Sequence, residues 1–348
     1  GSIVTVVYDG TNFQMTSQLA TDGGLTIGGS NTQVQYNSSG SLAGDADFTF
    51  DGSNVSLAKA LYLADGAVAT PSVTNTGDVN TGIYFPAADN VGVVTGGVEQ
   101  FRFGSNPVTS KNLIINGAMT VAQRGTLTGQ GGTTNTYTAC DRWKLREEGP
   151  GTARVTTSQD ALSAANAVLT KGSRYALKAD CTTAESSVAA GEALLICQSL
   201  EAQNLQMLDQ GAASAKSFAL SFAVSSPKSG THCVALLQGD ANRYYIAEYT
   251  VASADTFEHF KIIIPGDTSG QINNDTGEGM RITFPLTVGT NMHGSAGAWS
   301  NGEEYSTSNQ QNLMDNVSNN FFVTSVQIEE GAVCTDFAHE DISTTLAK

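Results

Sequence analysis

Residues 218–224 read FALSFAV, and this short stretch predicts how the larger part of the chain folds. Large apolar side chains recur at every second position, which is the period of a β-strand with one face in a hydrophobic core. The spacing of such segments is that of an antiparallel sandwich and not of strand–helix–strand units. We therefore expect residues 111–348 to fold as one jelly roll in an all-β protein. The other segments with this alternation are residues 244–249, 260–264, 280–284 and 322–328.

Two short segments of this half are compatible with a helix. Residues 200–208 read LEAQNLQML, and they are predicted to form one that Gly211 closes. Residues 161–169 also tolerate a helix, and the sequence leaves their conformation undecided.

Residues 1–110 have a different composition. Their only basic residues are Lys59 and Arg102, and their apolar residues come in short runs between Gly, Asn, Asp and Ser. The phrase YDGTNF at residues 8–13 is echoed by FDGSNV at residues 50–55. In both phrases an Asp-Gly pair stands between short apolar runs, which predicts a hairpin turn.

Strands this short leave a single chain unable to bury its apolar side chains. A lone hairpin is marginal in water, and exposed strand edges invite association. Identical chains that wrap around a common axis solve both problems, and closed symmetric homo-oligomers are common. We therefore expect residues 1–110 to form an intertwined, β-prism-like stalk in a homotrimer. A monomeric β-solenoid or a flexible decoration is the alternative.

The charge balance argues against two classes of partner. The chain carries 17 basic and 33 acidic residues, for a formal net charge of −16. Nucleic-acid affinity comes largely from Lys and Arg that displace counterions, and anionic membranes also attract basic surfaces. No apolar run approaches the roughly 18–20 residues that cross a bilayer. We expect neither nucleic-acid binding nor membrane insertion.

Motifs that carry catalytic or metal chemistry are not found. The five cysteines are odd in number and form no CxxC pair, so we expect buried, reduced side chains rather than disulfides or a zinc site. The sequence contains no nucleophile elbow, P-loop, HExxH or dinucleotide-binding glycine motif. His232 and Cys233 are neighbours, but on a strand they would point to opposite faces. We expect no catalytic residue, no metal and no cofactor.

Three separated phrases open the second half in a recognisable order. Residues 112–119 read NLIINGAM, residues 123–125 read QRG, and residues 137–143 read YTACDRW. The chain closes with TSVQIEEGAVCTDF at residues 324–337. In this succession residues 111–341 resemble the C-terminal domain of bacteriophage tail fibres. Within that resemblance, Trp143 is expected in the core and the Asp141–Arg142 pair at a strand corner.

The same two ends are also similar to carbohydrate-binding jelly rolls, whose first strand carries an N-G-x-F-E phrase. Met119 and Thr120 stand here in place of the aromatic residue and the acid. The similarity therefore implies a galactose-binding-like sandwich, and it does not extend to the calcium site that some such modules carry.

The front half resembles phage fibre shafts. The residues that carry this resemblance are TPS at 70–72, GDVNTGIY at 77–84 and TQVQYN at 32–37. The resemblance implies a virion structural protein: an extracellular, homotrimeric tail fibre used in host attachment. Its partners would be other virion tail proteins and a host surface glycan, lipopolysaccharide or capsule. A purely structural fibre or adaptor, without a ligand, is the alternative from another class.

Sugar binding requires aromatic faces that stack on pyranose rings, with nearby amides or carboxylates that bind hydroxyls. The loop at residues 299–305 offers both kinds of group, although Trp299 could instead cap the core. Tyr244 and Tyr245 form a second set, in which one ring should face outward. The candidate ligand-binding residues are Trp299, Asn301, Glu303, Tyr305, Tyr244 and Tyr245.

A glycan depolymerase is the third reading. Glycoside hydrolysis needs two carboxylates about 5–9.5 Å apart. Because the chain has 33 acidic residues, close pairs also occur by chance. The pairs in the sequence are Asp45 with Asp47, Glu303 with Glu304, and Glu329 with Glu330.

Overall fold

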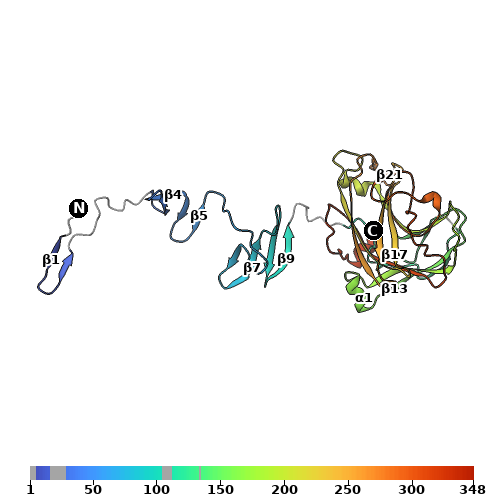
Figure 1. Ribbon diagram of the computed structural model, residues 1–348, viewed down its shortest axis with the longest axis horizontal. Helices are drawn as coiled ribbons and strands as arrows, with labels where there is room; N and C mark the ends of the chain where they lie inside the picture. The colour runs from blue at the N-terminus through green and yellow to red at the C-terminus, as the bar shows by residue number, and fades with distance from the viewer. Residues whose placement is uncertain (1–4, 16–28, 104–111, 133–134) are drawn as a thin grey trace. The chain divides into compact units, whose positions relative to one another are not determined.

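The computed structural model describes residues 5–15, 29–103, 112–132 and 135–348. It divides the chain into two units, Gly1–Ser105 and Asn106–Lys348 (Figure 1). The boundary expected at residues 110 and 111 lies outside the described residues. We call the two parts the N-terminal unit and the C-terminal unit and describe each by itself.

The N-terminal unit consists of small antiparallel sheets. The two Asp-Gly phrases form hairpin turns as predicted, and Gly10 and Gly52 both have a φ of +97°. In each turn the Asp carboxylate accepts backbone N–H groups two and three residues further on. The sheets are β1 (Val6–Tyr8) with β2 (Phe13–Met15); β3 (Gln33–Ser38), β4 (Ser41–Phe50) and β5 (Val55–Leu57); and β6 (Val73–Asn75), β7 (Asp78–Tyr84), β8 (Val91–Thr95) and β9 (Val98–Phe103).

The four-stranded sheet β6–β9 packs one face within the unit. On this face Tyr84 lies against Gly92, and its hydroxyl contacts Glu99. The opposite face carries a row of apolar side chains, one from each strand, that pair across the sheet: Val73, Ile83, Val93 and Phe101. Phe101 is 67% exposed.

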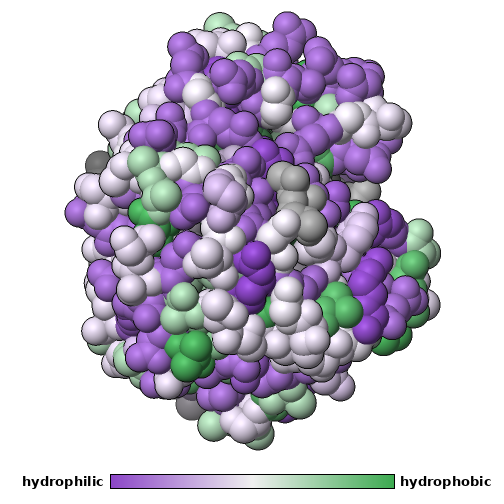
Figure 2. Space-filling view, turned by 90° about the vertical axis from the view of Figure 1, so that its right-hand side faces the viewer, coloured by the Kyte–Doolittle hydropathy of each residue, from purple (hydrophilic) through white to green (hydrophobic). Residues whose placement is uncertain are grey.

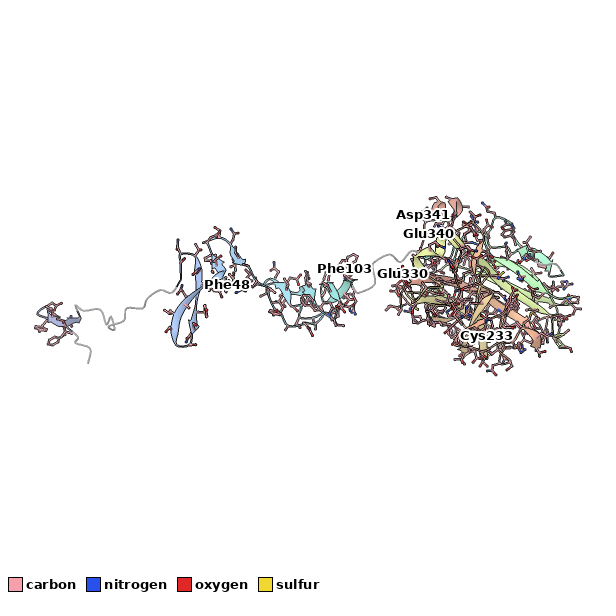
Figure 3. The ribbon with its side chains drawn as sticks, turned by 90° about the horizontal axis from the view of Figure 1, so that it is seen from above. Phe48, Phe103, Cys233, Glu330, Glu340 and Asp341 are labelled. Carbon is pink, nitrogen blue, oxygen red and sulfur yellow. The ribbon has the colours of Figure 1, made fainter. Side chains whose placement is uncertain are left out.

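The three-stranded sheet β3–β5 also presents an uncovered apolar face. Phe48 pairs with Leu57 across the strands and Phe50 pairs with Val55, and all four side chains are exposed. Figure 3 shows Phe48 and Phe103, each on a strand of this unit. Among the described residues of the N-terminal unit, the buried core includes only Tyr84 and Val94.

The C-terminal unit is an antiparallel β-sandwich, as expected. Its first sheet has the order β10 (Leu127–Gln130), β13 (Arg154–Ala161), β14 (Tyr175–Thr183), β22 (Asn320–Glu330), β16 (Phe218–Ser225) and β19 (Glu258–Ile264). The second sheet has the order β11 (Thr136–Tyr137), β12 (Lys144–Glu148), β15 (Ala193–Glu201), β20 (Glu278–Val288), β17 (Gly230–Gln238), β18 (Arg243–Val251) and β21 (Trp299–Asn301).

The main hydrophobic core lies between the two sheets. All five segments predicted from alternation are strands, and their inward side chains fill this core. Phe222 of the first sheet meets Phe284 of the second edge to face, with ring centroids 5.1 Å apart. Trp143 is fully buried there, as predicted.

Helices are few and short. Residues 200–208 contain the 3₁₀ helix η1 (Ala202–Leu208), which ends at Asp209 in a left-handed conformation; the prediction that Gly211 closes it is wrong. The undecided stretch contains α1 (Ala164–Leu169). The remaining helices are η2 (Thr290–Met292) and α2 (Ile342–Ala347).

The phrases that open and close the C-terminal unit meet in space. The Asn116 side chain donates to the carbonyls of Val121 and Asp141, and the indole of Trp143 donates to the Asn116 carbonyl. The Asn112 side-chain amide donates to the carbonyl of Val326 and accepts from the backbone N–H of Ile328, both in β22. These motif residues therefore act as a structural clamp between the first and last segments of the sandwich.

The Asp141–Arg142 pair lies in the turn before β12, at a strand corner as expected. Asp141 accepts a hydrogen bond from Arg124 of the QRG phrase, at 2.9 Å. Arg142 is exposed and has a φ of +72°.

The burial of four cysteines and the opposite orientations of His232 and Cys233 agree with the predictions. His232 and Cys233 point to opposite faces of β17: the histidine ring stacks on Tyr249 in the main core, whereas Cys233 belongs to a cluster on the outer face. Four of the cysteines are buried, and Cys334 is partly buried.

Candidate functional site

A band of charged side chains crosses the outward face of the second sheet. Strand alternation directs Arg146 of β12 and Arg281 of β20 to this face, with β15 between them. Residues 289–310, which we call the covering segment, run over the same face and bring Glu303 and Tyr305 to it. The site therefore joins two sheet strands to a segment far along the chain, since Arg146 and Glu303 are 157 positions apart.

Glu303 is the centre of this band. Its Oε1 atom accepts hydrogen bonds from Nη2 of Arg281 at 2.7 Å, Nη2 of Arg146 at 3.1 Å and the Tyr305 hydroxyl at 2.8 Å. The Tyr305 hydroxyl also lies 3.2 Å from Glu148, whose carboxylate pairs with Arg146. We call Arg146, Glu148, Arg281, Glu303 and Tyr305 the charged cluster.

The two neighbouring glutamates of the covering segment have opposite pKa shifts. Burial acts to raise the pKa of Glu303, but the Tyr305 hydroxyl and the charges of Arg281 and Arg146 outweigh it and hold the pKa below its ordinary value. Burial raises the pKa of Glu304; His293 opposes this shift only in part, and the Glu303 carboxylate adds to it. Glu303 therefore favours its charged form more than an ordinary glutamate does.

Tyr305 and Tyr244 are packed against the sheet rather than exposed to solvent. Tyr305 is 2% exposed and belongs to an apolar cluster with Leu195, Ala235 and Ile246. Tyr244 points outward from β18 but lies under Gly294 and Gly302 of the covering segment. The prediction that one of the Tyr244–Tyr245 rings is exposed is wrong, because each residue is only 6% exposed.

Trp299 and Tyr245 belong to the edge of the core. Their rings are 5.5 Å apart, and the Trp299 indole donates to the carbonyl of Pro265 at 2.7 Å. Trp299 is thus a capping residue, which was the alternative reading from sequence. Asn301 is exposed and accepts a hydrogen bond from Arg243 at 2.6 Å.

The structure brings in residues that the sequence did not single out. Arg146, Glu148 and Arg281 occupy polar positions on alternating strands, where a charged residue usually faces solvent. Arg281 is only 5% exposed, and a buried arginine requires partners. The single available signal was the placement of a basic residue inside the strongly apolar strand MRITF at residues 280–284.

One exposed aromatic ring lies on the same face of the second sheet. Tyr137 of β11 pairs with Lys144, and its ring is 45% exposed. The Arg124 guanidinium lies 4.4 Å from the ring centroid and the Lys144 ammonium 5.2 Å from it. Tyr137 is an aromatic group at the rim of this face that the sequence analysis did not select.

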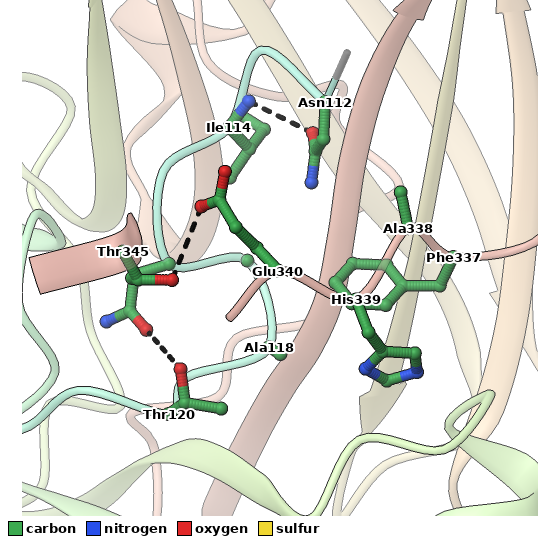
Figure 4. Close-up of a pocket in the computed structure, with 11 residues that line it drawn as sticks. Asn112, Ile114, Ala118, Thr120, Phe337, Ala338, His339, Glu340 and Thr345 are labelled. Atoms are coloured by element: carbon green, nitrogen blue, oxygen red, sulfur yellow. Dashed lines mark hydrogen bonds between the residues drawn. The ribbon is translucent and has the colours of Figure 1, made fainter. Parts of the chain in front are cut away.

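A hollow of about 230 Å³ lies between the opening phrase and the chain end (Figure 4). Asn112, Thr120, Phe337, Glu340 and Thr345 are among its lining residues. Its asparagines are engaged by the backbone clamp, and Glu340 is paired with Lys348 and hydrogen-bonded to Thr345. The polar groups of this hollow therefore hold the chain end in place.

A larger groove of about 440 Å³ lies beside η1. Its apolar lining includes Leu113 and Met207, and its polar lining includes Arg142, Gln203 and Asn204. Its size is in the range of small-molecule sites, but none of its described lining residues is an aromatic on which a sugar ring could stack.

Comparison with known proteins gives no family. No family model matches the chain, and no curated protein matches it. A bacteriophage CBA120 tailspike protein 4 enzymatically active domain matches at 13% identity and a TM-score of 0.29, over 55% of this chain and 19% of that chain. At these values the match carries no inference about function.

Carbohydrate-binding modules of Clostridium thermocellum match at a similar level. A family 11 module in complex with a β-1,3-1,4-mixed-linked tetrasaccharide has 14% identity and a TM-score of 0.28, over 61% of this chain and 98% of that module. The C-terminal family 22 module of Xyn10B has 17% identity and a TM-score of 0.29, over 57% and 90%. These similarities are too distant to carry a functional argument either.

The described residues include neither a metal-binding cluster nor a membrane-spanning helix. No group of three or more His, Cys, Asp or Glu side chains in the described part of the chain is arranged to hold a metal ion. No helix there is long and apolar enough to span a membrane.

Proposed function

We propose that this protein is a phage tail-fibre protein whose N-terminal unit assembles as a homotrimeric stalk and whose C-terminal sandwich binds a host surface glycan. The observation that carries the proposal is the contrast in burial between the two units. The C-terminal unit encloses a complete core, whereas the N-terminal unit leaves whole apolar sheet faces uncovered.

Sister chains fit these apolar faces better than another partner does. The faces recur in separate sheets along the unit, so a partner must offer matching apolar surface at each level. A parallel copy of the same chain does this automatically, because it repeats every sheet at the same height. Three copies around an axis would also cover strand edges that otherwise invite aggregation.

The charged cluster supports a polar, hydroxyl-bearing ligand. Sugar hydroxyls both donate and accept hydrogen bonds, and the cluster offers guanidinium donors next to carboxylate acceptors. Tyr137 adds an exposed aromatic surface on the same sheet face. Three linked sandwiches would convert weak binding at each site into firm attachment.

Binding rather than catalysis fits the geometry at Glu303. A general acid or a nucleophile must reach the reacting atom, whereas Oε1 of Glu303 already accepts hydrogen bonds from Arg281, Arg146 and Tyr305. We accordingly assign no catalytic residue and no cofactor. The proposed setting is the phage virion outside the cell, where the partners would be lipopolysaccharide or capsule and other tail proteins.

Retention of the 348-residue chain on host cells and on a glycan array tests the ligand-binding part of the proposal. Retention is expected, and it should decrease when soluble glycan from the same cells is added. A purely structural fibre or adaptor would show no retention on either surface. Release of reducing ends from polysaccharide would instead identify a depolymerase.

A further inference from the structure

Two cations lie against one exposed tyrosine ring at the edge of the second sheet. Tyr137 of β11 stands directly across from Lys144 of β12. The Arg124 guanidinium lies 4.4 Å and the Lys144 ammonium 5.2 Å from the centroid of the Tyr137 ring. Both positive charges are therefore held beside the same ring, which attracts cations through its π-electron face.

These positive charges are only partly balanced among the described residues. Asp141 pairs with Arg124 at 2.9 Å, whereas Lys144 forms no ion pair with any described residue. Arg142, in the turn before β12, is exposed and likewise has no hydrogen bond or ion pair in the described part of the chain. We call Arg124, Tyr137, Arg142 and Lys144 the basic rim. One carboxylate faces three basic side chains there, which leaves a local excess of positive charge.

The strands next to Lys144 do not supply the missing negative charge. Its partner on the other side is Cys197 of β15, and burial raises the pKa of that thiol to about 11, so the thiol is neutral at pH 7. The next residue of β12 on the same face is Arg146, whose guanidinium is bound by Glu148 and Glu303. Lys144 therefore has neutral groups and like charges as neighbours, and a bound anion would relieve their repulsion.

The rest of the chain makes such a place selective. With 33 acidic and 17 basic residues, the chain as a whole repels an anionic ligand. Hydrophilic residues cover most of the face shown in Figure 2, and the hydrophobic residues on it lie in small separate groups. Local charge and hydrogen bonding, rather than a large apolar patch, would therefore determine where an anionic ligand binds.

We propose that the basic rim binds the anionic group, a carboxylate or a phosphate, of an acidic sugar. The inference rests on the proposed glycan-binding function and specifies the class of glycan. The anion would lie between Lys144 and Arg124, because Arg124 uses Nη1 for Asp141 and keeps its other donors for a ligand. The exposed ring of Tyr137 would contact the body of the sugar.

Calorimetry of the 348-residue chain with glucuronic acid and with glucose tests this preference, since the two sugars differ in one carboxylate. Glucuronic acid is expected to bind about threefold more tightly or better, and added salt should reduce the difference by screening. Glucose 6-phosphate and inorganic phosphate test the phosphate case. The sugar phosphate should bind more tightly than inorganic phosphate, because the ring adds contacts of its own.

Lys144→Gln removes the cation that has no ion-pair partner. The variant should keep its Tm and its affinity for glucose, and its affinity for glucuronic acid should fall about threefold. Lys144→Arg keeps the charge and should retain the preference for the acidic sugar.

Lys178→Gln is the matched control. Lys178 lies on β14 of the first sheet, 5.8 Å from the ring centroid of Phe322, and is partly exposed as Lys144 is. This substitution changes the net charge of the chain by the same amount and removes the same kind of cation–ring contact. It should leave the affinity for glucuronic acid unchanged.

Three results would overturn the inference. One is equal affinity of the wild-type chain for glucose and glucuronic acid, together with retention on host cells; the glycan-binding function would then stand without this subsite. The second is an equal loss of glucuronic acid affinity in Lys144→Gln and Lys178→Gln, which would show general attraction by charge. The third is binding of inorganic phosphate as tight as that of glucose 6-phosphate. Absence of retention on both cells and arrays would contradict the proposed function itself.

Discussion

Glu303 is the residue on which the charged cluster depends. Its carboxylate is the hydrogen-bonded partner of the buried Arg281, so Glu303→Gln leaves a guanidinium with much less compensation. Because the Glu303 side chain is 43% exposed, solvent screens part of the loss. We expect the free energy of unfolding to fall by about 1–2 kcal/mol, measured by urea denaturation at neutral pH.

The neighbouring Glu304 provides the control for this substitution. Burial raises its pKa, so its charge is a cost to the folded state, and Glu304→Gln should leave stability unchanged or slightly higher. Equal destabilisation by the two substitutions would contradict the assignment of Glu303 as the centre of the cluster.

The lowered pKa of Glu303 also predicts how stability depends on pH. A carboxyl group whose pKa is lower in the folded chain than in the unfolded chain stabilises the folded state. This contribution is complete at pH values above the unfolded-state pKa. The contribution disappears as the pH falls through the folded-state pKa. The stability difference between wild type and Glu303→Gln should therefore be full at pH 7 and vanish in acid, as chemical denaturation at a series of pH values would show.

Tyr305 illustrates why alanine substitutions are poor tests of binding at this site. Its ring is packed in a buried apolar cluster, so Tyr305→Ala should lower the free energy of unfolding by about 3–5 kcal/mol and impair folding. Tyr305→Phe removes only the hydroxyl that meets Glu303 and Glu148, at a cost of about 1 kcal/mol. A thermal melt of both variants checks this ranking, and similar losses in the two would contradict it.

At the scale of elements, the opening phrase is a clamp that depends on Gly117. A Cβ at this residue would collide with the carbonyl oxygen of Val326 in β22, and a backbone atom inside a sheet cannot easily move away. Gly117→Ala should therefore destabilise the sandwich by about 1–3 kcal/mol. Gly191→Ala, at a position with open space around it, should have almost no effect on the same melt. A neutral Gly117→Ala would mean that the clamp is dispensable.

The apolar sheet faces of the N-terminal unit lead to a second prediction at this scale. Phe48→Ser and Phe101→Ser together remove large exposed rings from two separate sheets. In a single-chain protein this double change would be nearly neutral, whereas in a trimer it removes buried contacts. We expect the variant trimer to dissociate at a higher protein concentration than the wild-type trimer does. The Tm of the sandwich should stay unchanged. Gln100→Ser, an exposed polar change on β9, is the control.

The strands could be predicted from sequence because alternation is local. Residues 218–224 and 322–328 carry the two-residue period within themselves, and the Asp-Gly turns at Gly10 and Gly52 need no distant partner. Trp143 was placed correctly through its motif. The 3₁₀ character of η1 was not accessible, since it depends on how the chain closes at Asp209.

The candidate site was predictable only in part, because it depends on distant contacts. Exposure of Tyr244 depends on a covering segment about 50 positions away, which alternation along β18 does not reveal. The pairing of Arg146 with Glu303 joins residues 157 positions apart. The sequence therefore selected Glu303 as a carboxylate and Tyr305 as an aromatic group of one loop, and it could not show the arginines that contact Glu303.

At the scale of the whole molecule, the two units solve the burial of apolar surface in different ways. The C-terminal unit contains enough long strands to close a sandwich by itself. The N-terminal unit has short strands and glycine-rich turns, and it leaves one face of its sheets uncovered. Trimerisation is the step that would complete its core, and it would also present three glycan sites on one particle.

Light scattering of the 348-residue chain during size-exclusion chromatography distinguishes a trimer from a single chain. We expect a particle with three times the 36.2 kDa mass of one chain, stable on dilution. A folded particle with the mass of one chain, and with the N-terminal unit protected from proteolysis, would contradict it.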